Sequence, residues 1–229
     1  MVVYWWWNHN LYVRYVYLLK AWLNMEINST AFLIKIKLRH SLGRPSRSVF
    51  VQSEVAEENM ICKIRKWLLS DAEDLTVAIS NKKVQDNLRD GIPYPYTVQD
   101  GINFISAMLS ADENDTFAFA ITVDEKAIGS IGVYRQENIH RQTAELGYYI
   151  AEEYWGKGIM TEAIKQICQH VFQKSDIIRI YAEPFAYNIA SCRALEKAGF
   201  QYEGTLRNNA VKNGKVIDMK MYSILNTEL

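Results

Sequence analysis

The sequence has little of what marks disulfide-stabilised proteins or metalloenzymes. Its 229 residues include three cysteines, at positions 62, 168 and 192, and none of them forms a CxxC pair. The odd number argues against a disulfide framework and a zinc knuckle, and it favours a reducing, cytoplasmic compartment. The four histidines lack metal-ligand spacing. We therefore expect no metal.

A surplus of charge and a long apolar run are also missing. The chain has 26 Lys and Arg against 26 Asp and Glu, so its formal net charge is zero. Overall electrostatics thus gives no reason to expect binding to nucleic acid or to an anionic membrane. No uninterrupted apolar run approaches the roughly 18–20 residues of a membrane span. The expected partners are therefore neither nucleic acid nor membrane.

Residues 1–59 differ in composition from the remainder. They hold four of the six tryptophans and carry 7 Lys/Arg and 4 Asp/Glu, a balance of +3, whereas the remainder carries 19 and 22, or −3. This aromatic and basic extension could attach to a membrane interface. Alternatively, it is a loose appendage or lies upstream of a natural start at Met60 or Met25. We assign it no function and expect the domain to span 60–229.

From residue 60 onward the periodicity is regular. Alternation and turn signals predict strands over 61–67, 117–123, 127–135, 143–150, 177–183, 200–206 and 215–225. Capping signals and helical periodicity predict helices over 70–80, 84–88, 97–109, 158–173 and 188–198. The order of these elements, with a parallel crossover from about 143 to 183, predicts an α/β (α+β) domain with a mixed sheet.

Two glycines stand in the turn between a predicted strand and a predicted helix, in the stretch "EYWGKGIMTEA" at 153–163. The first N–H groups of a helix lack internal partners and carry partial positive charge. Gly156 and Gly158 remove side chains that would keep a ligand away, so the turn could form a nest for a phosphate group. It lacks both the GKS/GKT of a Walker loop and the GxGxxG of a Rossmann fingerprint. A tight structural connection remains the alternative.

Several separated segments favour the phosphate nest over a purely structural turn. "TAELGYYI", "EYWGKGIMTEA" and "AYNIASCRALEKAGF", with the opening "ICKIRKWLLSDAEDL" and the loop "IPYPYT", resemble the GNAT superfamily of N-acetyltransferases. Within it they look like the branch of ribosomal-protein-alanine N-acetyltransferases (RimJ/RimL type). The resemblance covers about 61–225. It implies a central sheet with helices on both faces and acetyl-CoA as co-substrate, its pyrophosphate on the glycine turn. Glu153 departs from the family's usual Gln or Arg.

The resemblance also implies where acetyl-CoA binds. Pantetheine would enter between strands 143–150 and 177–183 and bond the main chain at 148–150. Asn188 would contact pantetheine, although its plain interpretation is a helix N-cap. Trp155 and Tyr154 would pack beside the cofactor or under the sheet. The expected cofactor-binding residues are Tyr148, Tyr149, Ile150, Trp155, Gly156, Lys157, Gly158, Ile159, Met160, Thr161, Asn188 and Ser191.

Two residues are candidates for catalysis. Glu145 is the only acid in an apolar strand, where burial would raise its pKa and make it a better base. A carboxylate paired with an arginine, or one that positions the loop, is the alternative. By the resemblance, Ser191 would protonate or hydrogen-bond the sulfur, because Leu195 stands where many relatives carry a tyrosine. Cys192 fits a buried structural thiol better than a nucleophile.

Together these features predict an N-acetyltransferase that moves an acetyl group to a primary amine by direct attack in a ternary complex. The acceptor would be a protein N-terminus or a small-molecule amine. Tyr94, Tyr96 and Phe185 would line its pocket, or else pack loops. The sequence is compatible with a homodimer. The alternative function is a non-catalytic module that binds or senses acyl-CoA on the same fold.

Overall fold

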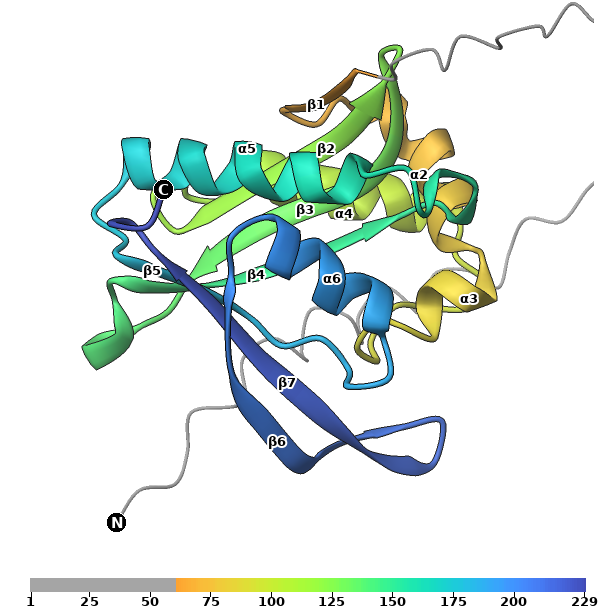
Figure 1. Ribbon diagram of the computed structural model, residues 1–229. Helices are drawn as coiled ribbons and strands as arrows, with labels where there is room; N and C mark the ends of the chain where they lie inside the picture. The colour runs from red at the N-terminus through yellow and green to blue at the C-terminus, as the bar shows by residue number, and fades with distance from the viewer. Residues whose placement is uncertain (1–60) are drawn as a thin grey trace, which may run out of the picture. The chain divides into compact units, whose positions relative to one another are not determined.

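The computed structural model describes residues 61–229, so the predictions for 1–59 and for Met60 lie outside the described residues. Within 61–229, seven strands form one sheet in the order β1-β2-β3-β4-β5-β7-β6 (Figure 1). The strands are β1 Cys62–Arg65, β2 Thr116–Val123, β3 Lys126–Arg135, β4 Thr143–Ile150, β5 Arg179–Ala182, β6 Gln201–Lys212 and β7 Lys215–Leu225. β4 and β5 run parallel and every other neighbouring pair is antiparallel, which confirms the mixed sheet.

Helices cover both faces of the sheet, as predicted. The longer helices are α2 Ala72–Ile79, α4 Val98–Ser110, α5 Ile159–Lys174 and α6 Ile189–Lys197. The shorter ones are η2 Leu69–Asp71, α3 Lys82–Gln85, η3 Asn138–His140 and η4 Glu152–Tyr154. α5 and α6 lie on the face nearer the viewer in Figure 1, and α2 and α4 lie behind the sheet. Among the described residues, no helix combines the length and apolar character that a bilayer crossing requires.

The alternation of β4 divides its side chains between two cores. Ala144, Leu146 and Ile150 are buried in the core beneath α5 and α6. On the opposite face, Tyr149 packs against the second core, which α2 and α4 cover. Glu145 shares this second face, since neighbouring residues of a strand point to opposite sides. β4 therefore carries its one carboxylate on the side of α2 and α4.

Some predicted element boundaries were wrong, and each for a physical reason. The sequence predicted that the short helix begins at residue 84. Instead, Asn81 caps α3, because its side chain accepts a hydrogen bond from Lys83 N at 2.8 Å. The helix predicted over 70–80 is divided into η2 and α2, and the Asp71 carboxylate stabilises the start of η2 by accepting a hydrogen bond from Leu68 N at 2.8 Å. β6 continues to Lys212 instead of 206, because pairing with β7 extends it to the turn.

The parallel strands β4 and β5 are paired only at their beginnings. The register joins Thr143, Ala144 and Glu145 to residues 179–181, and the pairing ends there although β4 continues for five more residues. The carboxyl-terminal ends of the two strands therefore separate. The separation of these strands, predicted from the resemblance, is present.

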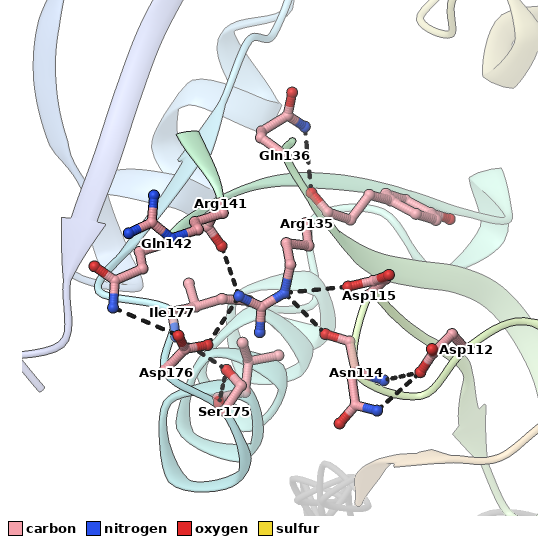
Figure 2. A network of polar contacts seen from close by, with 12 residues as sticks. Asp112, Asn114, Asp115, Arg135, Gln136, Arg141, Gln142, Ser175, Asp176 and Ile177 are labelled. Atoms are coloured by element: carbon pink, nitrogen blue, oxygen red, sulfur yellow. Dashed lines mark hydrogen bonds and ion pairs between the residues drawn. The ribbon is translucent and has the colours of Figure 1, made fainter. Parts of the chain in front are cut away.

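Polar contacts of Arg135, at the end of β3, fix the paired end of these strands (Figure 2). Its Nη1 donates to the carbonyl of Arg141 at 2.6 Å and lies 2.8 Å from an Asp176 carboxylate oxygen. Its Nε donates to the Asn114 carbonyl at 3.0 Å and lies 3.3 Å from Asp115. Residues 141 and 176 lie in the segments that lead into β4 and β5, so one guanidinium fastens the starts of both strands.

Candidate functional site

The separation of β4 and β5 opens into a cleft of about 580 Å³. The cleft runs from the segment after α3 to the turn before α5, along the start of α6. Of the residues predicted to bind a cofactor or to act in catalysis, all but one line it: Glu145, Tyr148, Tyr149, Ile150, Trp155, Gly156, Gly158, Ile159, Met160, Thr161, Asn188 and Ser191. Lys157 is the exception; its ammonium lies 5.3 Å from the centre of the Tyr154 ring.

The glycine turn forms an open cradle at the start of α5. Gly156 and Gly158 have φ of +75° and +78°, a left-handed conformation that other residues adopt at a cost. A Cβ added at either glycine would meet nothing within 4 Å. The first helical hydrogen bond runs from Glu162 N to Gly158 O, so the amides of 159–161 precede it, and no side chain caps this end of the helix among the described residues. The turn therefore suits an anionic group.

Trp155 closes one side of this cradle. Its indole Nε1 donates to the carbonyl of Ile150 at 2.9 Å, across the turn from β4 to η4. The side chain is still 41% exposed, so one edge of the indole faces outward while the other is fixed. Trp155 thus holds the end of β4 to the glycine turn and borders the cleft.

The start of α6 brings Asn188 and Ser191 to the cleft. Asn188 is the N-cap of α6, and its side-chain oxygen accepts from Ser191 N at 3.1 Å. The N-cap interpretation of Asn188 is thus confirmed, and its side-chain NH₂ group has no partner in 61–229. Ser191 Oγ lies 2.7 Å from the phenol oxygen of Tyr148. Burial raises the pKa of Tyr148 far above its ordinary value, so the phenol stays protonated.

Two carboxylates and one guanidinium meet where β4 and β5 separate. Arg89, in the segment after α3, donates from Nη2 to Glu145 and lies 3.4 Å from Glu183 with the same nitrogen. Sequence reasoning missed both Arg89 and Glu183. Burial raises the pKa of Glu183 and the charge of Glu145 raises it further, whereas Arg89 lowers it. Glu145 is therefore paired with an arginine. This is the arrangement that the sequence analysis gave as the alternative to a free catalytic base.

Tyr134 forms a wall of the cleft next to this charged group. It pairs across the strands with Glu145, and its ring covers Gly132. A Cβ at Gly132 would come 2.5 Å from the Tyr134 hydroxyl oxygen, so only glycine leaves room for the ring. Burial, followed by the charge of Glu145, raises the pKa of Tyr134. Sequence reasoning missed this residue, although paired glycines at 132 and 147 were a usable signal.

α6 also contributes positive charge that sequence reasoning overlooked. Arg193 and Lys197 line the cleft and lie four residues apart on α6. Neither takes part in an ion pair with a side chain of 61–229. Their spacing of four residues would have predicted that the two cations share one face of α6.

The aromatic residues expected around the acceptor have different positions. Phe185 lines the cleft and packs against Tyr187 with ring centres 5.4 Å apart. Tyr96 is buried in the core between the sheet and the helices α2 and α4, which is the packing alternative. Tyr94 is 61% exposed and does not line the cleft. Cys192 is buried, as expected of a structural thiol.

Comparisons with known proteins agree with this architecture. The sequence pattern described as "Acetyltransferase (GNAT) domain" matches residues 62–201. The chain is 36% identical over 120 residues to the probable N-acetyltransferase YjcK of Bacillus subtilis (strain 168), a match that spans 52% of this chain and 66% of that relative.

Two solved structures share the fold at lower identity. One is RimL, a ribosomal L7/L12 alpha-N-protein acetyltransferase in complex with coenzyme A, with a TM-score of 0.64, 21% identity, and coverage of 72% of this chain and 93% of that one. The other is spermidine N-acetyltransferase from Vibrio cholerae in complex with CoA and spermine, with a TM-score of 0.61, 22% identity, and coverage of 73% and 96%. Because the sequence pattern matches well over half of the chain and the folds agree, this protein belongs to the GNAT acetyltransferase family.

Proposed function

We propose that this chain is an N-acetyltransferase that moves the acetyl group of acetyl-CoA to a primary amine by direct attack in a ternary complex. The observation that supports this most is one continuous cleft. It has an open glycine cradle at one end, two carboxylates where β4 and β5 separate, and Ser191 between them on α6. An anion site, a base and a hydroxyl donor are the groups that amide formation from a thioester needs.

The chain's residues fit a coenzyme A thioester. The free amides at 159–161 and the room at Gly156 and Gly158 would bind its pyrophosphate. Arg193 and Lys197 would bind phosphate oxygens along α6. Main-chain groups at 148–150, beyond the last β4–β5 pair, and the Asn188 NH₂ group would bind the pantetheine amides. Bound there, acetyl-CoA supplies an activated acyl group with a thiolate as leaving group.

The carboxylates would prepare the amine. An α-amino group has an ordinary pKa of about 7.7–8.0, so at neutral pH much of it is protonated and cannot attack. We propose that Glu145 and Glu183 act as a coupled pair, which receives the ammonium proton directly or through water. The raised pKa of Glu183 makes this carboxylate a stronger base than an ordinary glutamate. The neutral nitrogen then forms the C–N bond while the C–S bond breaks.

Ser191 would assist the departing sulfur. The protonated Tyr148 phenol, 2.7 Å away, can donate to Ser191 Oγ, which leaves the serine proton directed into the cleft. A thiol has a pKa of about 8.5, so its thiolate is a weak base and a hydrogen bond from a neutral hydroxyl is enough to stabilise it. We therefore assign Ser191 as the donor to sulfur and Tyr148 as the residue that orients it.

The class of amine that accepts the acetyl group is a separate part of the proposal. The two fold relatives named above act, by their names, on a ribosomal protein N-terminus and on spermidine, so both a protein amine and a small amine remain candidates. The carboxylates at 145 and 183 would suit either, because each offers a primary ammonium. We favour a protein or peptide amine, since only two carboxylates, those of Glu145 and Glu183, line the described cleft, and both are paired with Arg89.

A thiol-release assay tests the proposed function. Purified full-length protein would be incubated with acetyl-CoA and a panel of amines: an alanine-initiated peptide, a serine-initiated peptide, spermidine and n-butylamine. We expect release of free thiol with at least one acceptor, acetylation of that acceptor by mass spectrometry, and its loss in Glu145→Gln. Coenzyme A binding with no turnover on any acceptor would instead favour the acyl-CoA sensor.

A further inference from the structure

The segment between α3 and residue 91 is fastened at both ends across the cleft. At its start, Asn81 donates to the Glu152 carboxylate at 2.7 Å, and Lys83 pairs with the same carboxylate. Glu152 belongs to η4, just before the glycine turn. These contacts hold the start of the segment at the cradle end of the cleft.

The far end of the segment is held by the β6–β7 hairpin. Lys212 lies 2.7 Å from the Asp90 carboxylate, and the Asn213 side chain donates to Asp86 at 3.0 Å. The Tyr187 hydroxyl also donates to the main-chain carbonyl of Asp86, at 2.7 Å. Arg89 lies between these two fixed acids, so its position over the cleft is set by its neighbours in sequence.

The Arg89 side chain is held by its hydrogen bond to Glu145 and by its ion pairs with Glu145 and Glu183. Its side chain is 58% exposed, whereas those of Glu145 and Glu183 are 23% and 20% exposed. Among the described residues it is the one cation in an ion pair with either carboxylate. An exposed ion pair of this kind is weak and readily exchanged. The two carboxylates thus form a largely buried cation site, and the guanidinium that occupies it is open to solvent and to exchange.

We propose that Arg89 is a specificity-determining residue that occupies the acceptor's place: the guanidinium fills the two-carboxylate subsite until a primary ammonium displaces it. The kinetic test of this inference rests on the proposed function, because it requires turnover of an amine. An acceptor would enter as a cation and exchange with Arg89 on the carboxylates. It would then give one proton to the pair and attack as a neutral amine, so charge and protons balance. An uncharged acceptor of the same shape would not displace Arg89.

Three variants give the kinetic test. Arg89→Met removes the competitor and keeps much of the side chain's length, Arg89→Lys keeps the charge, and Arg207→Met is the matched control. Arg207 is an exposed arginine of β6, away from the cleft. With the best amine of the panel, Arg89→Met should lower KM about two- to fivefold, the factor that loss of an exposed ion pair gives. Arg89→Lys should restore most of the wild-type KM, and Arg207→Met should match wild type.

A role for Arg89 in merely orienting Glu145 predicts the opposite pattern. In that case kcat would fall in Arg89→Met while KM stayed constant or rose. A lower kcat in Arg89→Met with a constant KM would overturn the proposal, and so would a lower kcat with a raised KM. The division between KM and kcat is therefore the decisive readout, because both roles would alter kcat/KM.

Displacement can also be observed without turnover. The Nε–Hε signal of Arg89 in the ¹⁵N–¹H spectrum, assigned by its absence in Arg89→Lys, would be followed during titration with n-butylammonium chloride. We expect it to move toward the position of an exposed arginine, while n-butanol and equal concentrations of sodium chloride leave it in place. An Arg89 signal that stays fixed under n-butylammonium would overturn the inference.

The two proposals can fail separately. If no amine of the panel is acetylated but n-butylammonium still displaces Arg89, the proposed function fails and the exchange at the carboxylates stands. If acetylation proceeds while the Arg89 signal and KM are insensitive to amine and to substitution, the enzyme stands and the exchange fails.

Discussion

The phenol oxygen of Tyr148 lies 2.7 Å from Ser191 Oγ, although 43 residues separate the two in sequence. Tyr148 belongs to β4 and Ser191 to α6, so the hydrogen bond crosses the inner end of the cleft. Burial keeps the phenol protonated, so it can donate a hydrogen bond to Ser191 Oγ. The pair is therefore a fixed source of one hydrogen bond directed toward a ligand.

Substitution of this pair should weaken turnover without abolishing it. Ser191→Ala removes the donor to the sulfur and should lower kcat about tenfold, the value of one hydrogen bond to a charged group. Tyr148→Phe leaves the serine in place but unoriented, so its loss should be smaller. Tyr202→Phe is the control, since that hydroxyl also lies 2.7 Å from a partner, Thr205 Oγ1, at an exposed site. A full-rate Ser191→Ala would remove Ser191 from the mechanism.

Substitution of Glu145 should change both the rate of the reaction and its pH dependence, which also reflects Glu183. Glu145→Gln should lower kcat at neutral pH about a hundredfold, a typical general-base contribution. It also removes the negative charge that raises the pKa of Glu183, so that pKa falls. The acid limb of kcat/KM in the residual activity should therefore move to lower pH. Steady-state rates across the pH range would measure both effects. Kinetics identical to wild type would reject the base assignment for Glu145.

The glycine cradle should be needed for binding and not only for the turn. Gly158→Ala places a side chain at φ +78° and should cost about 1 kcal/mol of folding free energy, together with most of the affinity for coenzyme A. Gly214→Ala is matched to it, because Gly214 has φ +73° and open space around it, but lies in the hairpin turn. Calorimetric titration with coenzyme A and urea unfolding would separate the two effects. Equal affinity in both variants would contradict an anion site at 156–158.

Acid stability should depend on one ion pair at the β5–β6–β7 edge. Two hydrogen bonds from Arg179 and one from Ser223 lower the pKa of Glu203 from 4.5 to about 2. A depressed carboxyl pKa contributes stability that is complete above the unfolded value of 4.5 and is lost as the pH falls from there toward about 2. The free energy of unfolding in urea should thus drop between pH 5 and pH 2.5, within roughly this window.

Glu203→Gln should flatten that drop, because it removes the titrating group. Glu137→Gln is a suitable control, since among the described residues this carboxylate takes part in none of the ion pairs. An unchanged acid limb in Glu203→Gln would show that other groups dominate acid unfolding.

Local sequence signals predicted the parts of the fold that depend on local chemistry. Thr97 caps α4 in a reciprocal hydrogen-bonded arrangement with Asp100, and β7 has the bounds that its alternation predicts. The Asn213-Gly214 pair does form the hairpin turn, with both residues at positive φ. By contrast, nothing local to β6 indicates that it extends to Lys212, since only the partner strand supplies the pairing.

The candidate site was predictable where one segment carries the chemistry, as in the glycine turn and the start of α6. Contacts between distant segments were not. Arg89 lies 56 residues from Glu145 in sequence, and no periodicity relates the two. Glu183 follows β5 directly, so its position at the separation of the strands becomes visible only once the end of β4–β5 pairing is known. Charged groups that meet through tertiary structure leave no trace in spacing.

The Arg135 network has a consequence for how substrates enter and leave. Because this guanidinium secures the segments that lead into β4 and β5, we expect any opening of the cleft to be a rotation about that end of the strands. Displacement in a rotation grows with distance from the pivot. We therefore expect the end at the glycine cradle to swing through the widest arc, and Glu145, beside the pivot, to move least. Such an enzyme can release a long carrier molecule again and again and still keep its reacting groups in alignment.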